Sequence, residues 1–228
     1  MSDYSSVPDY FHLMSSLYHE RQSWQLCLLH TLNNLLQHPR FSKPDLDRIS
    51  KKLHSDSLAI TTQASPGILS STLSWLQYMT TPNPHRAVWG TGNYDVNVLE
   101  CALREAGCEM EWFDKRRSLQ TLFFVGEIGA IEDGDGVVGA PASDDGVRTD
   151  RPRKRELIGI ILNDAPRNHW FCVRPVPAER ADVGPSSRDW WNLDSKLEHP
   201  ERIGGDERLM GWLEKKDFQV LLVYKSLE

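Results

Sequence analysis

Residues 18–37, YHERQSWQLCLLHTLNNLLQ, contain the pattern on which the fold depends. Ser23 is suited to the N-cap of a helix that runs to the end of this stretch, and Trp24 joins the leucines in a buried stripe. Cys27 then lies in the first turn, where the positive end of the helix dipole favours a thiolate over a thiol. Gln22 can turn its amide towards the same position and, with the Cys27 backbone N–H, offer two donors to an oxyanion. The stretch therefore predicts the nucleophile half of a thiol site.

Two simpler interpretations of the same stretch compete with this one. A lone cysteine on an apolar helix is most often a small core residue. Cys27 and His30 also form a C-x-x-H pair, as zinc ligands do, but no two further ligands stand at a recognisable spacing. We therefore expect no metal, a core or supporting role for His30, and structural roles for the other three cysteines, Cys101, Cys108 and Cys172.

The rest of the chain predicts an α+β domain in which helices come first and antiparallel strands follow. A second helix is expected over residues 43–54, capped by Ser42, and a third over residues 95–106, ended by Gly107. The expected strands are short apolar segments bounded by turn residues, at 109–113, 157–162, 169–174, 189–194 and 218–224. A last helix is expected around residues 206–215.

The length of 228 residues fits one domain with insertions. We expect a flexible leader over residues 1–17 and a single catalytic domain over residues 18–225. Residues 56–83 combine a Ser- and Thr-rich composition with an apolar pattern, which indicates a helical arm. Residues 127–156 are rich in Gly and Asp and then basic, which is typical of a disordered insertion.

Composition argues against several classes of partner. The formal net charge is −6, so no broad basic surface is expected to attract nucleic acid. No run of about 18 apolar residues is present, and the N-terminus lacks the pattern of a signal peptide. We therefore expect neither a nucleic-acid nor a membrane partner, a monomer, and a reducing, cytoplasmic setting for the four cysteines. The run RPRKRE at 151–156 is similar to a nuclear-targeting patch, but a solvated loop edge explains it better.

His169 is the candidate among the eight histidines to complete the thiol site, because it follows a turn-like segment and opens a strand. If Arg174 pairs with Asp189, then His169 lies opposite Asp194 on the returning strand. Cross-strand neighbours have Cβ atoms about 4.5–5.5 Å apart, close enough for a carboxylate to hold an imidazole. The loop between the strands does not fix this register, and Asn192 on the same face is the competing partner. By default, a carboxylate at a strand end is a surface group.

These residues together predict an acyl-transfer site. Cys27 attacks a carbonyl as the thiolate, and His169 protonates the leaving amine. Asp194 fixes the tautomer of the imidazole and stabilises its charged form, with Asn192 in a supporting role. Gln22 and the Cys27 N–H bind the oxyanion.

Four blocks of the sequence together resemble the Josephin family of deubiquitinating cysteine proteases, and most of all its short members. The blocks are HERQSWQLCLLHTLNNLLQ, NPHRAVWGTGNYDVNVLECAL, NHWFCVR and WWNLDSKL, and they stand in the family's order. The resemblance implies a papain-like α+β fold with N-terminal helices packed on a C-terminal antiparallel sheet. It also implies that Cys27 is the nucleophile, His169 the base, Asp194 the third member and Gln22 the oxyanion donor.

The same resemblance implies a substrate. It predicts a thiol isopeptidase that hydrolyses the bond at the C-terminal glycine of ubiquitin, in conjugates or chains, without a cofactor. Ubiquitin and ubiquitinated proteins are then the partners, and Val96 and Asn97 belong to the ubiquitin-contacting surface. A non-catalytic ubiquitin-binding module is the first rival, and the complete set of site residues argues against it. An amidase or transferase for small substrates is the second, and the family blocks outside the site argue against that.

Overall fold

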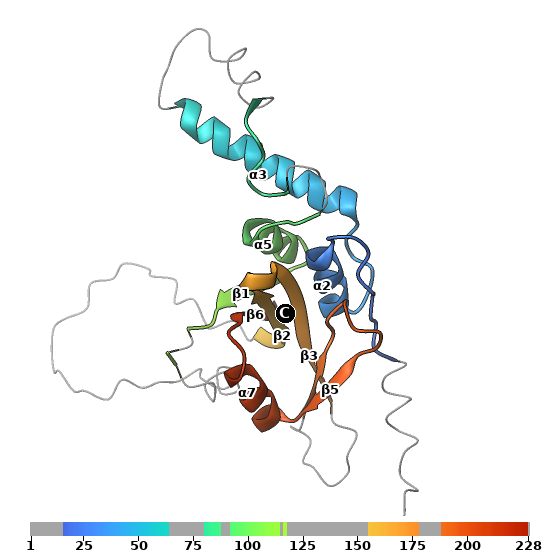
Figure 1. Ribbon diagram of the computed structural model, residues 1–228. Helices are drawn as coiled ribbons and strands as arrows, with labels where there is room; N and C mark the ends of the chain where they lie inside the picture. The colour runs from blue at the N-terminus through green and yellow to red at the C-terminus, as the bar shows by residue number, and fades with distance from the viewer. Residues whose placement is uncertain are drawn as a thin grey trace, which may run out of the picture.

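The computed structural model describes residues 16–63, 80–87, 92–114, 116–117, 155–177 and 188–227 (Figure 1). Its principal elements, in chain order, are α2 (Cys27–Leu36), α3 (Lys43–Gln63), α5 (Val96–Glu105), β1 (Cys108–Trp112), β2 (Arg155–Asp164), the 3-10 turn η1 (Ala165–Arg167), β3 (His169–Pro177), β4 (Arg188–Asn192), β5 (Glu201–Gly204), α7 (Asp206–Glu214) and β6 (Gln219–Ser226). Most of the expected leader and of the two expected insertions lies outside the described residues. The predicted α+β arrangement is confirmed.

The strands form one antiparallel sheet in the order β1-β6-β2-β3-β4-β5. The central strands β2 and β3 are a hairpin closed by η1, in which Asp164 pairs with His169. Both central strands have a neighbour on each side, and their apolar residues alternate between the two faces of the sheet. This places His169 at one end of the most enclosed part of the sheet.

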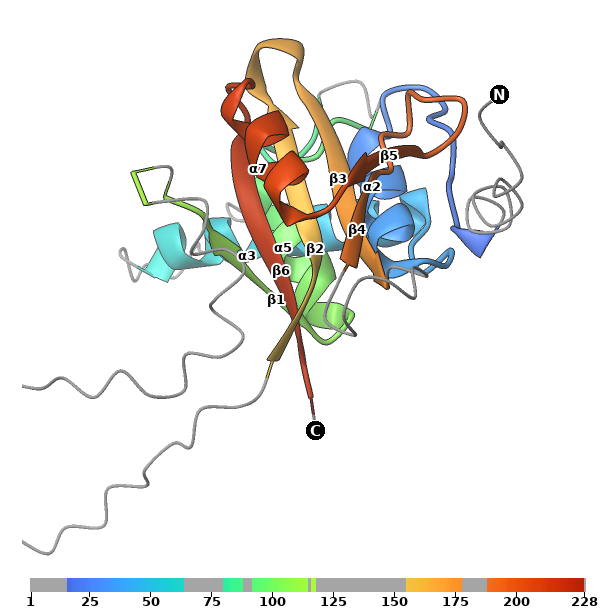
Figure 2. The ribbon, with the colours of Figure 1, turned by 90° about the horizontal axis from the view of Figure 1, so that it is seen from below.

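Helices cover both faces of the sheet. Figure 2 shows α7 on the face opposite to α2 and α5, and the buried residues form two matching clusters. Ile161 and Cys172 point towards α2 and α5, whereas the neighbouring Ile160 and Phe171 belong to the cluster under α7. The expected packing of N-terminal helices on the sheet is thus confirmed, and α7 adds a second layer.

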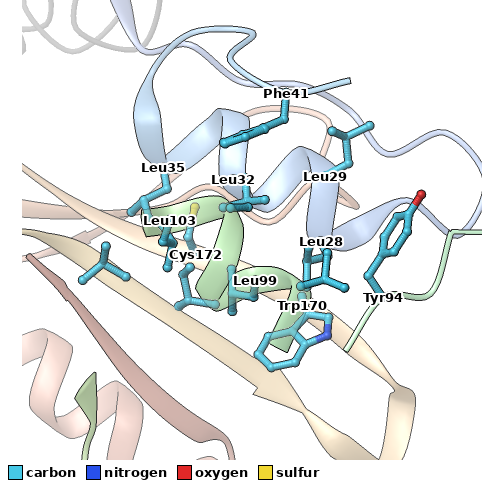
Figure 3. Packing of buried hydrophobic residues seen from close by; sticks show 14 of the residues in the cluster. Leu28, Leu29, Leu32, Leu35, Phe41, Tyr94, Leu99, Leu103, Trp170 and Cys172 are labelled. Carbon is cyan, nitrogen blue, oxygen red and sulfur yellow. The ribbon is translucent and has the colours of Figure 1, made fainter. Parts of the chain in front are cut away.

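The packing under α2 fixes where that helix begins relative to β3. Leu28, Leu32 and Leu35 are fully buried and lie in one cluster with Leu99 of α5 and Trp170 of β3 (Figure 3). Truncating one such leucine to alanine typically costs about 2–5 kcal/mol. The N-terminus of α2 is therefore held firmly above the start of β3.

The prediction that this helix begins at Ser23 is wrong. The helix begins at Cys27, and the residue at its N-cap, Leu26, makes no side-chain capping bond. Trp24 stands in the left-handed region with φ 56° and is 86% exposed, so it does not join the buried stripe. A residue in this conformation cannot continue a right-handed helix, so Cys27 is the first residue of the helix and does not lie within a longer first turn.

The other helices follow the sequence more closely. Helix α3 begins beside Ser42 as predicted but continues to Gln63, beyond the expected end at residue 54. Asp95 caps α5 by accepting the N–H groups of Asn97 and Val98, and Gly107 follows the helix with φ 73°. The four-residue strand β5 was not predicted, because its sequence ERIG has neither length nor clear alternation.

The predicted register between the third and fourth strands is also wrong. Arg174 pairs with Trp191, and Asp189 pairs with Val176, so the register differs by two residues from the expected one. Because side chains alternate with a period of two, a shift of two residues keeps every side chain on its predicted face. The error therefore moves His169 and Asp194 out of direct opposition but leaves them on the same side of the sheet.

Candidate active site

His169 and Asp194 meet at the end of the sheet despite the shifted register. The imidazole Nε2 lies 2.7 Å from Asp194 Oδ1, and both side chains are shielded from solvent. The Leu193 N–H still donates to the Cys172 carbonyl at 2.9 Å, after which the chain leaves the sheet. That departure brings the next residue, Asp194, across to the imidazole.

Short contacts from its own turn hold Asp194 in place. The Lys196 N–H donates to Asp194 Oδ1 at 2.9 Å, and Asn192 Oδ1 accepts the Asp194 N–H at 3.1 Å. Asn192 thus bonds to the backbone of the turn, whereas Asp194 bonds to the imidazole. The ring of His19, which sequence reasoning missed, lies 3.0 Å from the Asp194 carbonyl and ties residues 16–23 to the same turn.

Cys27 faces the same imidazole from the first residue of α2. Its side chain forms a hydrogen bond with His169 and is almost fully buried. Since Asp194 occupies Nε2, the other ring nitrogen, Nδ1, is left for the thiol. Cys27 at the start of α2 contacts His169, and His169 contacts Asp194, so the three side chains form one continuous series of contacts.

The contacts of His169 set its charge. Burial disfavours the imidazolium and lowers its pKa, but the hydrogen bonds with Asp194 and Cys27 outweigh burial and raise the pKa of His169 to about 9. At neutral pH the imidazole is therefore mostly protonated. A protonated imidazole beside a thiol stabilises the thiolate, which is the nucleophilic form of cysteine.

Gln22 lies beside the Cys27, His169 and Asp194 group, but hydrogen bonds already restrict the orientation of its side chain. Its backbone N–H donates to the Ser195 carbonyl at 2.7 Å, which anchors it next to the Asp194 turn. Its side-chain Nε2 donates to the Trp24 carbonyl at 2.8 Å, leaving the second hydrogen of the amide for another acceptor. As the first residue of α2, Cys27 has no acceptor within the helix for its own N–H.

A second histidine–carboxylate pair supports the segment that carries Gln22. His30 Nδ1 lies 2.7 Å from Glu20 Oε2, and His30 Nε2 accepts the Ser23 N–H at 3.3 Å. Asn33 donates to both oxygens of Glu20, and Asn34 bonds to its backbone on both sides. His30 therefore has a supporting role in the structure, and within the described residues no three metal-binding side chains converge on one point.

Val96 and Asn97 lie at the start of α5, at the edge of a cavity. The cavity has a volume of about 460 Å³ and is lined by residues within 84–87 and 93–96, by Trp112 and Gln219, and by the β2–β3 turn up to Trp170. Val96 is among its lining residues, while Asn97 is exposed beside it. Trp170 directly follows His169 in β3, but its side chain belongs to the cluster under α2 and α5, whereas the His169 ring stacks on Phe171 of the other cluster.

A helix that presents a cysteine to a histidine and an aspartate on an antiparallel sheet defines the papain-like α+β class. The Josephin family model matches residues 22–123 and 135–224. The chain belongs to the Josephin family.

Several known members of this family are similar to the chain. Human Josephin-2 is 32% identical over 87% of this chain and 78% of its own length. A Josephin-like protein of Drosophila melanogaster is 31% identical over 86% of this chain and 67% of its own length. Human ataxin-3 is 26% identical over 83% of this chain, which spans 40% of that longer protein. None of the described helices is long and apolar enough to cross a bilayer.

Proposed function

We propose that this protein is a thiol isopeptidase that hydrolyses the bond at the C-terminal glycine of ubiquitin in conjugates or chains. The observation that carries the proposal is the imidazole of His169, which bonds to Asp194 through Nε2 and to the thiol of Cys27. The chain belongs to the Josephin family. Its resemblance to the deubiquitinating proteases of this family supports ubiquitin as the substrate.

In the first half of the reaction, the Cys27 thiolate attacks the carbonyl carbon of the terminal glycine. The C=O π electrons move onto oxygen, and the Cys27 N–H and the free amide hydrogen of Gln22 bind the oxyanion. When the tetrahedral intermediate collapses, the C–N bond breaks and the imidazolium of His169 gives its proton to the departing amine. The products are a thioester on Cys27, a neutral imidazole and the released lysine side chain.

In the second half, His169 acts as a base. It takes a proton from water as the oxygen attacks the thioester, and the C–S bond then breaks to release the Cys27 thiolate and the carboxylic acid of ubiquitin, which loses its proton to solvent. Asp194 stabilises the imidazolium in both halves without itself accepting the proton. The Cys27 thiolate and the His169 imidazolium that began the reaction are thereby restored.

The burial of the two reacting residues suits a tail without side chains. Cys27 and His169 are both buried, so a substrate has to enter as a thin extended segment. The Gly-Gly end of ubiquitin is such a segment. We place the body of ubiquitin against Val96 and Asn97, beside the cavity that borders Trp170.

A ubiquitin that carries a C-terminal electrophile tests the proposal directly. The parent protein should form a covalent adduct one ubiquitin larger, and Cys27→Ala should form none. Reversible binding without an adduct would favour the alternative function, a non-catalytic ubiquitin-binding module of the same fold. No interaction with ubiquitin at all would exclude both functions.

A further inference from the structure

Trp24 combines two features that are unfavourable for an isolated folded chain. Its backbone has φ 56°, a left-handed conformation that a bulky side chain rarely adopts. Its side chain is 86% exposed, the highest value among the large apolar residues of the described part of the chain. Such strain persists only where the surroundings impose it, and it concentrates at functional sites.

The surroundings of Trp24 do impose this conformation. On one side, the Trp24 carbonyl accepts a hydrogen bond from Gln22 Nε2, and His30 Nε2 accepts the Ser23 N–H. On the other side, Asn93 Nδ2 donates to Gln25 Oε1 at 3.1 Å. The turn is thus held from both ends, with the indole at its tip.

The close approach of residue 92 shows how tightly the turn packs. A Cβ added to Gly92 would lie 2.3 Å from Leu26 Cδ2, and φ at this position is +101°. Only glycine therefore fits here without displacing the turn. Residues 92–93 continue directly through Asp95 to Val96, which lines the cavity.

This arrangement indicates where the indole of Trp24 would lie along a bound substrate. The leaving amine has to lie on the side of His169, because His169 protonates it. The acyl chain leaves the scissile carbonyl in the other direction. If the body of ubiquitin docks at Val96 and Asn97 as proposed above, the tail would run past residues 92–93, which lead to Val96 along the chain. Trp24 accepts a hydrogen bond from Gln22 through its carbonyl and precedes Gln25 and Leu26, the residues that contact residues 92–93, so its exposed indole would border that path.

We propose that Trp24 is a specificity-determining residue whose indole packs against the glycine-rich C-terminal tail on the acyl side of the scissile bond. A flat indole can lie against peptide planes that carry no side chains, whereas a bulkier tail would be held away from Cys27. The inference rests on the proposed function, since the tail is that of ubiquitin.

Two substitutions distinguish a contact between the Trp24 indole and the substrate from an effect of residue 24 on the backbone conformation. Trp24→Asn removes the indole but tolerates the left-handed conformation, whereas Trp24→Phe keeps an aromatic face and the same strain. Leu227→Asn is the matched control, because Leu227 is 51% exposed and follows β6 at the end of the sheet remote from His169. Each variant is assayed on ubiquitin with a small fluorogenic C-terminal amide and on isopeptide-linked diubiquitin.

We expect Trp24→Asn to lower kcat/KM about tenfold on both substrates, mainly through KM, because the contact exists in the ground state as well. Trp24→Phe should stay within about threefold of the parent, since a phenyl ring keeps part of the stacking surface. Leu227→Asn should match the parent. The melting temperature of Trp24→Asn should equal or exceed that of the parent.

Three results would overturn the inference. These are an unchanged kcat/KM for Trp24→Asn, a loss confined to diubiquitin, or a melting temperature that falls together with the activity. Failure of the proposed function is a different result, because the parent itself would then leave the ubiquitin electrophile unreacted.

Discussion

Among the described residues, two histidine–carboxylate pairs have the same separation but differ in what the other ring nitrogen contacts. His169 lies 2.7 Å from Asp194, and His30 lies 2.7 Å from Glu20. The first pair joins the sheet to a turn beyond β4, and the second joins α2 to the segment that precedes it. What distinguishes them is the second ring nitrogen. In His169 that nitrogen is left for the thiol of Cys27, and in His30 it accepts a backbone N–H from Ser23.

The comparison shows that a carboxylate–imidazole contact does not by itself define a catalytic residue. In His30, Nδ1 contacts Glu20 and Nε2 accepts the Ser23 N–H, so both ring nitrogens are used within the protein. In His169 the group at the second nitrogen is a potential nucleophile. The first pair should therefore govern turnover and the second should govern the position of Gln22.

The largest expected effect is the loss of turnover in His169→Ala. Without the imidazole, neither the leaving amine nor the attacking water has a proton-transfer partner, and kcat should fall by roughly 1,000-fold or more. Hydrolysis of a fluorogenic ubiquitin amide measures this. His30→Ala should remain far more active, and equal losses in the two variants would contradict the distinction drawn between the pairs.

The next effect is the contribution that His169 makes to the dependence of stability on pH. Its folded-state pKa of about 9 exceeds the ordinary value of 6.5, so folding takes up protons and the stabilisation is complete below pH 6.5. This stabilisation should be lost as the pH rises to 9, which lowers the free energy of unfolding by at most about 3 kcal/mol. Urea unfolding of the parent and of His169→Ala between pH 6 and 9 measures the difference, and parallel curves would refute the assignment.

A smaller effect distinguishes Asp194 from Asn192. Asp194→Ala should lower kcat about 30-fold and still leave measurable turnover, because the imidazole keeps its contact with Cys27. Asn192→Ala should cost less, since the Asn192 side chain accepts the backbone N–H of Asp194 and does not contact the imidazole in the described structure. An inactive Asn192→Ala beside a nearly normal Asp194→Ala would reverse the two roles.

The smallest effect concerns the supporting pair. Glu20→Gln keeps the shape of the side chain but weakens its bonds to His30 and Asn33, which should cost about 1–2 kcal/mol of stability in urea unfolding. Because Gln22 binds charge only in the transition state, kcat should fall several-fold while KM stays unchanged. A change in KM alone would show that the pair does not position the oxyanion donor.

Sequence reasoning found the fold class and the residues that meet, and it failed where tertiary contacts override local signals. The face of each strand follows from a period of two, so His169 and Asp194 were placed on the correct side although the register was wrong by two residues. The predicted start of α2 is wrong because the residue in the left-handed conformation is Trp24. Gly or Asn usually occupies such a position, so the sequence gives no sign of it. His19 and Glu20 carried no pattern of their own and gained their partners only in the folded chain.

The packing of α2 on β3 has a consequence for how the protein reaches its active form. Cys172 Sγ donates to the Thr31 carbonyl, and these two residues are 141 positions apart in the chain. Contacts between such distant segments close large loops and tend to form late and slowly during folding. During synthesis, Cys27 therefore emerges long before His169. Reaction with a ubiquitin electrophile would then report that the chain has folded far enough to bring His169 to Cys27.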